Sequence, residues 1–171
     1  VRQELGLTKG AGFCREIGAG FLGYLATWTI MAFSALISIG LWFLIQQIRG
    51  SAPPPPSHPV GEILGNSGWH AVIILFITAA VAAPLVEEVL FRGALQRALR
   101  FYRASRWVGV PLMGFIFAAI HPQGIIAIPM LMAIGIGFGL IREWRDSLLG
   151  PIVMHGLHNG SIVLMMVALQ G

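Results

Sequence analysis

The chain has 171 residues, of which 56% are hydrophobic and only 11% are charged, whereas roughly 25% of residues are charged in an average soluble domain. One soluble domain of this length cannot bury so much apolar surface, and the same composition excludes intrinsic disorder. The formal charge of +4 resides mostly in short arginine clusters rather than on a hydrophilic face, which excludes a nucleic-acid binder, and the single cysteine excludes an intramolecular disulfide. The composition therefore predicts an integral membrane protein.

Five apolar segments follow an N-terminal segment of residues 1–16. They are residues 17–48, 69–86, 107–120, 124–141 and 148–169. The third is short for a span of about 30 Å of hydrocarbon, and the helix of the second is expected to continue through Arg92. Only helices and closed barrels satisfy the backbone in lipid, and continuous apolar segments favour helices. The sequence therefore predicts an all-α polytopic membrane helix bundle with about five transmembrane helices, and residues 51–59 form an extended proline-rich connector.

Basic residues alternate from one connector to the next. They precede the first segment, follow the second, and separate the fourth from the fifth: Arg2, Lys9 and Arg15; Arg97, Arg100, Arg103 and Arg106; Arg142 and Arg145. By the positive-inside rule, this pattern predicts a cytoplasmic N-terminus and cytoplasmic arginine-rich loops. The arginines between 97 and 106 are also compatible with a contact to anionic membrane lipid.

Ionisable groups inside apolar segments are costly, and they mark candidate functional positions. The second segment ends in Glu87, Glu88 and Arg92. Glu88 and Arg92 are four residues apart, the spacing of a helical ion pair, whereas Glu87 is rotated by about 100° to another face. We expect Glu88 and Arg92 to form a structural pair, and Glu87 to act as a general base in a membrane cavity.

Two further groups lie in the third and fifth segments. His155 and Asn159 share one helix face and can both donate toward one point, as an oxyanion hole requires, whereas His158 is expected to make a structural hydrogen bond between helices. His121 is expected to orient Glu87 or a water molecule, and Phe117, one turn earlier, to support the site. At about 1.5 Å per residue, His121 lies about two turns deeper than Glu87 and His155, so its helix must tilt or start deeper for the groups to meet.

A zinc site is the competing interpretation of the same residues, with Glu87, His121, His155 and His158 as ligands. The chain has no H-E-x-x-H motif and no two histidines four residues apart on one helix, and asparagine is a poor zinc ligand. We therefore expect no metal and no other cofactor, with zinc as the alternative.

Three motifs occur in order on successive segments: E-E-x-x-x-R from Glu87 to Arg92, F-x-x-x-H from Phe117 to His121, and H-x-x-x-N from His155 to Asn159. In this combination the chain resembles the CPBP family, which comprises the CAAX proteases and bacteriocin-processing enzymes and is also called the Abi family of intramembrane proteases. It is similar to the Ras-converting CAAX endopeptidase. The chain begins at Val1 rather than Met and has fewer spans than is typical of the family, which fits an N-terminal truncation at Val1.

The resemblance implies roles for the motif residues. Glu87 and His121 would activate the water that attacks the scissile amide, and His155 and Asn159 would stabilise the oxyanion. Glu88 and Arg92 would support the site by pairing. Residues 17–171 would then form a membrane-embedded protease domain behind a cytoplasmic segment of residues 1–16.

The sequence thus predicts an intramembrane endopeptidase that cleaves near the C-terminus of a membrane-associated or prenylated, CAAX-type substrate. No serine or cysteine is placed as a nucleophile. The expected partners are a peptide or lipidated protein and membrane lipid, not nucleic acid, and the expected location is a bacterial or archaeal plasma membrane. The alternatives are a zinc-dependent embedded metalloprotease, or a non-enzymatic immunity or transport membrane protein in which Glu87 carries protons.

Overall fold

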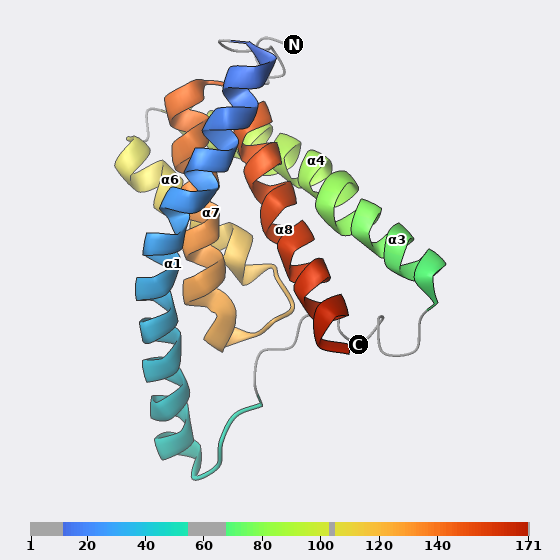
Figure 1. Ribbon diagram of the computed structural model, residues 1–171. Helices are drawn as coiled ribbons and strands as arrows, with labels where there is room; N and C mark the ends of the chain where they lie inside the picture. Colours follow the sequence, from blue (N-terminus) through green and yellow to red (C-terminus); the bar gives the residue numbers. More distant parts are fainter. Residues whose placement is uncertain (1–11, 55–67, 103–104, 171) are drawn as a thin grey trace.

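The computed structural model describes residues 12–54, 68–102 and 105–170, and within these ranges every regular element is a helix. Most of residues 1–16 and of the proline-rich connector 51–59 lie outside the described residues. The elements are α1 (Phe13–Arg49), α3 (Trp69–Ile77), η1 (Thr78–Ala82), α4 (Ala83–Glu88), η2 (Val89–Leu95), α5 (Gln96–Phe101), α6 (Arg106–Ala119), η3 (Ile125–Ala127), α7 (Ile128–Arg145) and α8 (Leu149–Gln170) (Figure 1).

Four helical stretches are long and apolar enough to cross a membrane: Phe13–Arg49, Trp69–Phe101, Ile125–Arg145 and Leu149–Leu169. The second contains α3, α4 and α5 together with η1 and η2, which are π-helical. Helix α6 has 14 residues, or about 21 Å, and is therefore shorter than the hydrocarbon layer. The prediction of an all-α membrane bundle is confirmed, and the chain is an integral membrane protein.

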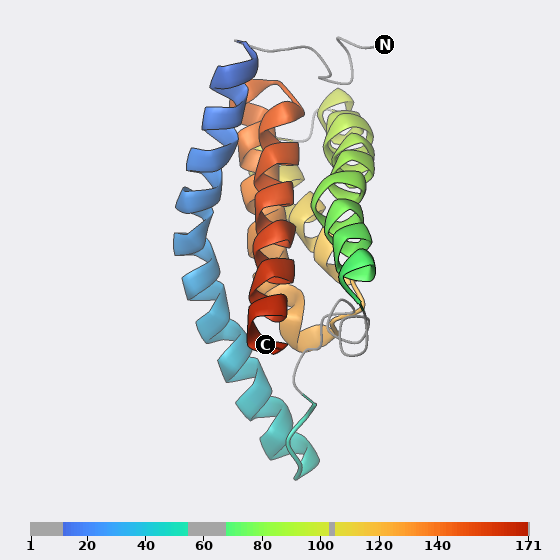
Figure 2. The same ribbon diagram turned by 45° about the vertical axis from the view of Figure 1, so that its right-hand side comes forward.

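Helix α7 lies at the centre of the bundle and packs against α1, α6 and α8. Figures 1 and 2 both show α8 between α1 on one side and α3–α4 on the other. Close packing of α6 on α7 depends on two glycines, because a Cβ on Gly114 would lie 2.9 Å from the carbonyl oxygen of Met132, and one on Gly135 would lie 2.9 Å from the Cα of Gly114. Small residues let membrane helices approach in this way.

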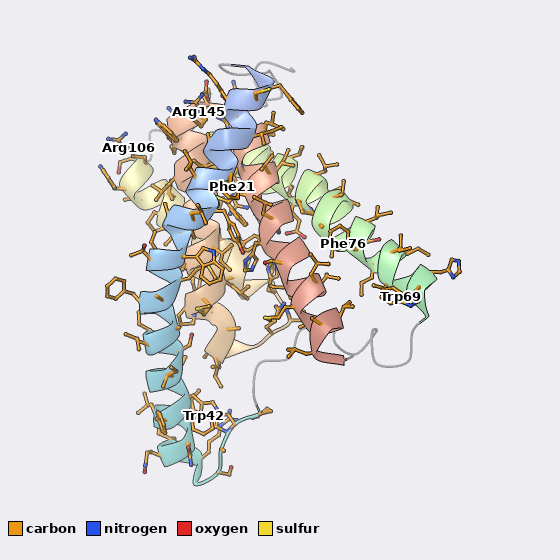
Figure 3. All side chains as sticks on the ribbon, in the orientation of Figure 1. Phe21, Trp42, Trp69, Phe76, Arg106 and Arg145 are labelled. Atoms are coloured by element: carbon orange, nitrogen blue, oxygen red, sulfur yellow. The ribbon has the colours of Figure 1, made fainter. Side chains whose placement is uncertain are left out.

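The arginine-rich loops lie at one end of the bundle. Figure 3 shows Arg106 and Arg145 at the end where α1 begins, with Trp42 at the opposite end. Arg145 donates to Glu16 through two hydrogen bonds of 2.7 and 3.3 Å, and the Glu16 side chain is completely buried. This pair fixes the start of α1 to the end of α7, and α1 begins at Phe13, about one turn before the apolar segment expected from residue 17.

The alternation of helix directions predicts the result of reporter fusions. A reporter fused after Arg106 or after Arg145 is expected in the cytoplasm, and one fused after Pro56 on the opposite side, because the basic ends of the helices stay inside. Protease accessibility of each reporter in sealed vesicles measures this. Reporters after Pro56 and Arg106 on the same side would mean that residues 69–101 do not cross the membrane.

Candidate active site

One cavity of about 270 Å³ inside the bundle is lined by all four residues that the sequence assigns to catalysis: Glu87, His121, His155 and Asn159. Phe117 lines the same cavity. Helix α6 begins at the arginine-rich end and ends partway down the bundle in Figures 1 and 2. Near its C-terminal end, the ring of Phe117 lies 5.7 Å from that of His155 on α8, and His121 lines the same cavity as Glu87. The difference in depth expected for His121 therefore does not keep it from the other residues.

Glu88 and Arg92 form a completely buried ion pair, with Arg92 Nη1 donating to Glu88 Oε1 over 2.8 Å. The structure thus contains the pair expected from the helical spacing. The same carboxylate oxygen accepts a second hydrogen bond of 2.8 Å from Nδ1 of His155. Sequence reasoning did not find this contact, because its two residues are 67 positions apart and no local pattern joins them.

Arg92 is held from several directions at once. Its Nη2 donates to the carbonyl oxygen of Gly135 over 2.9 Å. Its guanidinium carbon lies 5.0 Å from the ring centre of Phe117, 5.1 Å from that of Phe138 and 5.7 Å from that of Phe91. A buried charge is tolerated only with such partners, and the aromatic faces add cation–π attraction. Phe117 therefore supports the site by contacting Arg92.

His155 is buried and oriented by two contacts. Its ring stacks on Phe138 with centroids 4.7 Å apart and an angle of 23° between the rings. Its Nδ1 is used by Glu88, so Nε2 is the nitrogen left for the cavity, and it lies 3.9 Å from Oε2 of Glu87. That distance is too long for a direct hydrogen bond. Glu87 is partly exposed, and its Oε2 has no hydrogen-bond partner among the described residues.

His121 is oriented in the same way by its own helix. Its Nδ1 lies 2.6 Å from the carbonyl oxygen of Phe117, and a carbonyl only accepts, so Nδ1 carries the hydrogen. In the neutral ring, the second nitrogen, Nε2, then has a lone pair. Both cavity histidines therefore have Nδ1 engaged elsewhere, which leaves Nε2 available for a substrate or a water.

Asn159 is anchored by an irregularity in the second transmembrane stretch. In η1 the N–H of Ala83 bonds to the carbonyl of Thr78, five residues earlier. In this register the next carbonyl, that of Ala79, would require the N–H of Pro84, which proline lacks. The Asn159 amide nitrogen donates to the Ala79 oxygen over 2.9 Å instead. π-helical segments often occur at functional sites, and here one supplies the partner of a cavity residue.

A second set of polar contacts runs from the site to the arginine-rich end. Three side chains of η2 and α5, spaced four residues apart, each contact the residue of α7 that lies 43 positions later in the sequence. These contacts are Arg92 to Gly135, Gln96 to Gly139 and Arg100 to Glu143. Gln96 also donates to Glu143 over 2.8 Å. We call these contacts the polar seam. Sequence reasoning missed Gln96 and Glu143, although the spacing of Arg92, Gln96 and Arg100 on one helix face was a signal available in the sequence.

No group of three or more histidine, cysteine, aspartate and glutamate side chains within the described ranges is arranged to hold a metal ion. Of the ligands considered for zinc, His121 and His155 each have one ring nitrogen committed to a protein acceptor. A protein acceptor on one ring nitrogen is also usual for a zinc-binding histidine, whose other nitrogen binds the metal. The expectation that the site uses no metal therefore stays a prediction, and no step of the chemistry below is drawn through a metal.

Comparison with known proteins agrees with the three motifs. A model of the family "type II CAAX prenyl endopeptidase Rce1-like" matches residues 69–161. This range contains every residue assigned to the site. The resemblance to the CAAX proteases, drawn from the sequence, is confirmed, and members of that family are membrane-embedded peptidases. No solved structure matches the chain significantly.

Three relatives are similar over parts of the chain. An uncharacterized 24.3 kDa protein of Escherichia coli is 27% identical over 125 residues, covering 71% of this chain and 55% of its own. The membrane-embedded CAAX protease MroQ of Staphylococcus aureus is 26% identical over 148 residues, covering 82% and 58% respectively. The uncharacterized protein YpbD of Bacillus subtilis is 34% identical over 85 residues, covering 48% and 39%. The chain thus spans about half the length of the first two relatives.

The contact of α8 with η1 predicts that alanine substitution destabilises the protein at one glycine of α8 and not at another, one turn away. A Cβ on Gly156 would lie 2.6 Å from the carbonyl oxygen of Ala80, whereas one on Gly160 would lie 3.4 Å from the Ala80 Cβ. Gly156→Ala must therefore push η1 away from α8, and we expect a loss of about 1–3 kcal/mol in stability. Gly160→Ala is expected to change stability by about 0.5 kcal/mol or less. Thermal unfolding in detergent measures both, and equal melting temperatures would contradict the packing of Gly156 on Ala80.

Proposed function

Because the chain belongs to the Rce1-like family of type II CAAX prenyl endopeptidases, we propose that it is an intramembrane endopeptidase acting near the C-terminus of a prenylated, membrane-associated protein. The observation that carries the proposal is the cavity in which Glu87 and the Nε2 atoms of two oriented histidines face one space. This cavity combines a carboxylate that can act as a base with groups that can hydrogen-bond a substrate, and it lies inside a membrane helix bundle.

Glu87 is the general base in this proposal. Of the two adjacent glutamates, only Glu87 lines the cavity, since Glu88 Oε1 already accepts from Arg92 and His155. A water hydrogen-bonded to Glu87 loses a proton to the carboxylate as its oxygen attacks the scissile carbonyl carbon. The protonated Glu87 then gives that proton to the leaving nitrogen, so the C–N bond breaks without a covalent enzyme intermediate.

The remaining cavity residues have supporting roles. His121 accepts from the attacking water through Nε2 and orients it, because its Nδ1 donates to the Phe117 carbonyl. His155 is placed to stabilise the oxyanion through Nε2, because its Nδ1 is held by Glu88. Asn159 adds the second of its two N–H groups, since the first is bound to Ala79.

An apolar groove next to the cavity is an argument for a lipid-modified substrate. The groove has a volume of about 480 Å³ and lies between α1, α7 and α8. Four of its lining residues also line the cavity: Leu131, Ile134, His158 and Ile162. We assign the groove to the isoprenoid chain, which would place the peptide bond next to the lipidated cysteine at Glu87.

The role of Glu87 is tested by Glu87→Gln, which keeps the size of the side chain and removes its basic oxygen. We expect kcat on a farnesylated peptide to fall by about 10²–10⁴, the usual contribution of a general base. The melting temperature is expected to stay unchanged, because Glu87 Oε2 makes no hydrogen bond to a described residue. Activity must also persist with a chelator present, and a loss restored by zinc would replace this mechanism with a metal-dependent one.

Glu88→Gln is the matched control. It leaves Arg92 buried without its counter-charge, which costs about 3–5 kcal/mol when burial is complete. Loss of activity should therefore accompany loss of folded protein, and the double variant Glu88→Gln with Arg92→Leu should recover folded protein. If Glu87→Gln were active while Glu88→Gln were folded and inactive, the two roles would have to be exchanged.

The groove is tested by Ala35→Phe, which fills it from α1. We expect KM for a farnesylated peptide to rise about ten-fold, because losing the burial of about two methylene groups of the isoprenoid chain costs that much in affinity. KM for the unmodified peptide should not change. Ala32→Phe is the control, because Ala32 is exposed on the same helix and does not line the groove. Equal effects of both variants on both peptides would contradict the assignment.

A further inference from the structure

A second cavity, of about 510 Å³, opens at the arginine-rich end of the bundle between α5 and α7. Arg97 and Arg100 of α5 and Arg142 of α7 line it together with Glu143 and Asp146. It lies at the outer end of the polar seam, and Arg92 at the inner end also lines it. The proposed proteolysis uses none of the arginines Arg97, Arg100 and Arg142.

The positive charges of this cavity are only partly compensated. Arg100 pairs with Glu143 over 3.3 Å, and Arg142 pairs with Asp146 over 2.7 Å. Arg97 is exposed, and it makes no ion pair with any residue in the part of the chain that the structure describes. Glu143 is further shared with Gln96. An anion entering the cavity therefore meets positive charge in excess.

Arg142 is the buried charged residue of this cavity. Its side chain is 7% exposed, yet the carboxylate that compensates it, Asp146, is 85% exposed. Its Nε is buried without a hydrogen-bond partner among the described residues. Guanidinium carries five N–H donors in a fork that matches the oxygens of phosphate, and burying such a group is costly unless its donors are used. Arg142 thus has an unused donor, Nε, beside the cavity.

The depth of the cavity points to a lipid rather than a solute. Exposed aromatic side chains surround this end of the bundle: Phe101, Tyr102, Trp107 and Trp144. Arg106 and Arg145, shown at this end in Figure 3, lie over the rings of Trp107 and Trp144 at 5.0 Å. Such aromatic belts mark the level of lipid headgroups. Phe101 lines the cavity itself, so the cavity opens at headgroup depth.

We propose that this cavity binds the phosphate of an anionic lipid headgroup, with Arg97, Arg100 and Arg142 as its donors. The phosphate would complete the compensation of Arg142 and link α5 to α7 across the outer end of the polar seam. Charge-assisted hydrogen bonds from arginine to phosphate are strong and directional, so one bound lipid per chain is expected.

The test measures lipid binding to the purified protein in neutral detergent by native mass spectrometry, independently of any proteolysis. Dioleoylphosphatidylglycerol is the anionic probe, dioleoylphosphatidylcholine the zwitterionic probe with the same chains, and inorganic phosphate the soluble anion. We expect one phosphatidylglycerol to bind at concentrations where phosphatidylcholine does not. Arg97→Gln should weaken this binding about five-fold, the scale of one basic residue beside an anionic headgroup, and adding Arg100→Gln should weaken it about thirty-fold in total.

Arg106→Gln is the matched control, because Arg106 lies at the same end and does not line the cavity. It should change binding by less than about two-fold, and Arg97→Gln should melt at the wild-type temperature. Equal weakening by Arg97→Gln and Arg106→Gln would overturn the proposal in favour of diffuse attraction. Equal binding of the two lipids would also overturn it, as would binding of inorganic phosphate but not of phosphatidylglycerol.

Discussion

The arrangement of the candidate site depends on the burial of one positive charge. Arg92 has no exposed surface, and an isolated buried ion costs several kcal/mol. Glu88 supplies the counter-charge, Gly135 supplies a carbonyl, and the rings of Phe117 and Phe138 cover the faces of the guanidinium. These partners come from two transmembrane stretches and from the shorter helix α6, so satisfying one charge brings three helical segments together.

The same network separates the functions of two adjacent carboxylates. Glu88 Oε1 is occupied by Arg92 and His155, and its side chain is completely buried. Glu87 is one position further round the helix and lines the cavity. Adjacent residues on a helix point in directions about 100° apart, so one helix provides both a structural anion and a group open to a ligand. His155 touches both environments, through Nδ1 at Glu88 and Nε2 toward Glu87.

Helix phase and charge pattern were sufficient to predict several of these features. The pairing of Glu88 with Arg92 follows from the spacing within one segment, and the common end of the arginine clusters follows from their alternation between connectors. The meeting of Glu87, His121, His155 and Asn159 in one cavity was implied by the family resemblance rather than by spacing, because distance along the segments placed His121 about two turns deeper. The contact of Glu88 with His155 and that of Gln96 with Glu143 could not be derived in this way, because they depend on the rotation of one helix against another. The π-helical register of η1 was equally hidden, since it depends on tertiary packing, although Pro84 marked the place where a helical hydrogen bond had to fail.

The register of η1 also ties together two positions that are far apart in the sequence. Pro84 leaves the Ala79 carbonyl without its helical donor, and Asn159 supplies a replacement. A residue with an N–H at position 84 would compete for that carbonyl and release the Asn159 amide to rotate. A proline without the asparagine would leave the carbonyl unsatisfied inside the bundle, which costs about 1–3 kcal/mol. Neither position can change alone at no cost, so in the evolutionary record of this architecture a proline at position 84 and an asparagine on the adjacent helix α8 should be inherited as a pair.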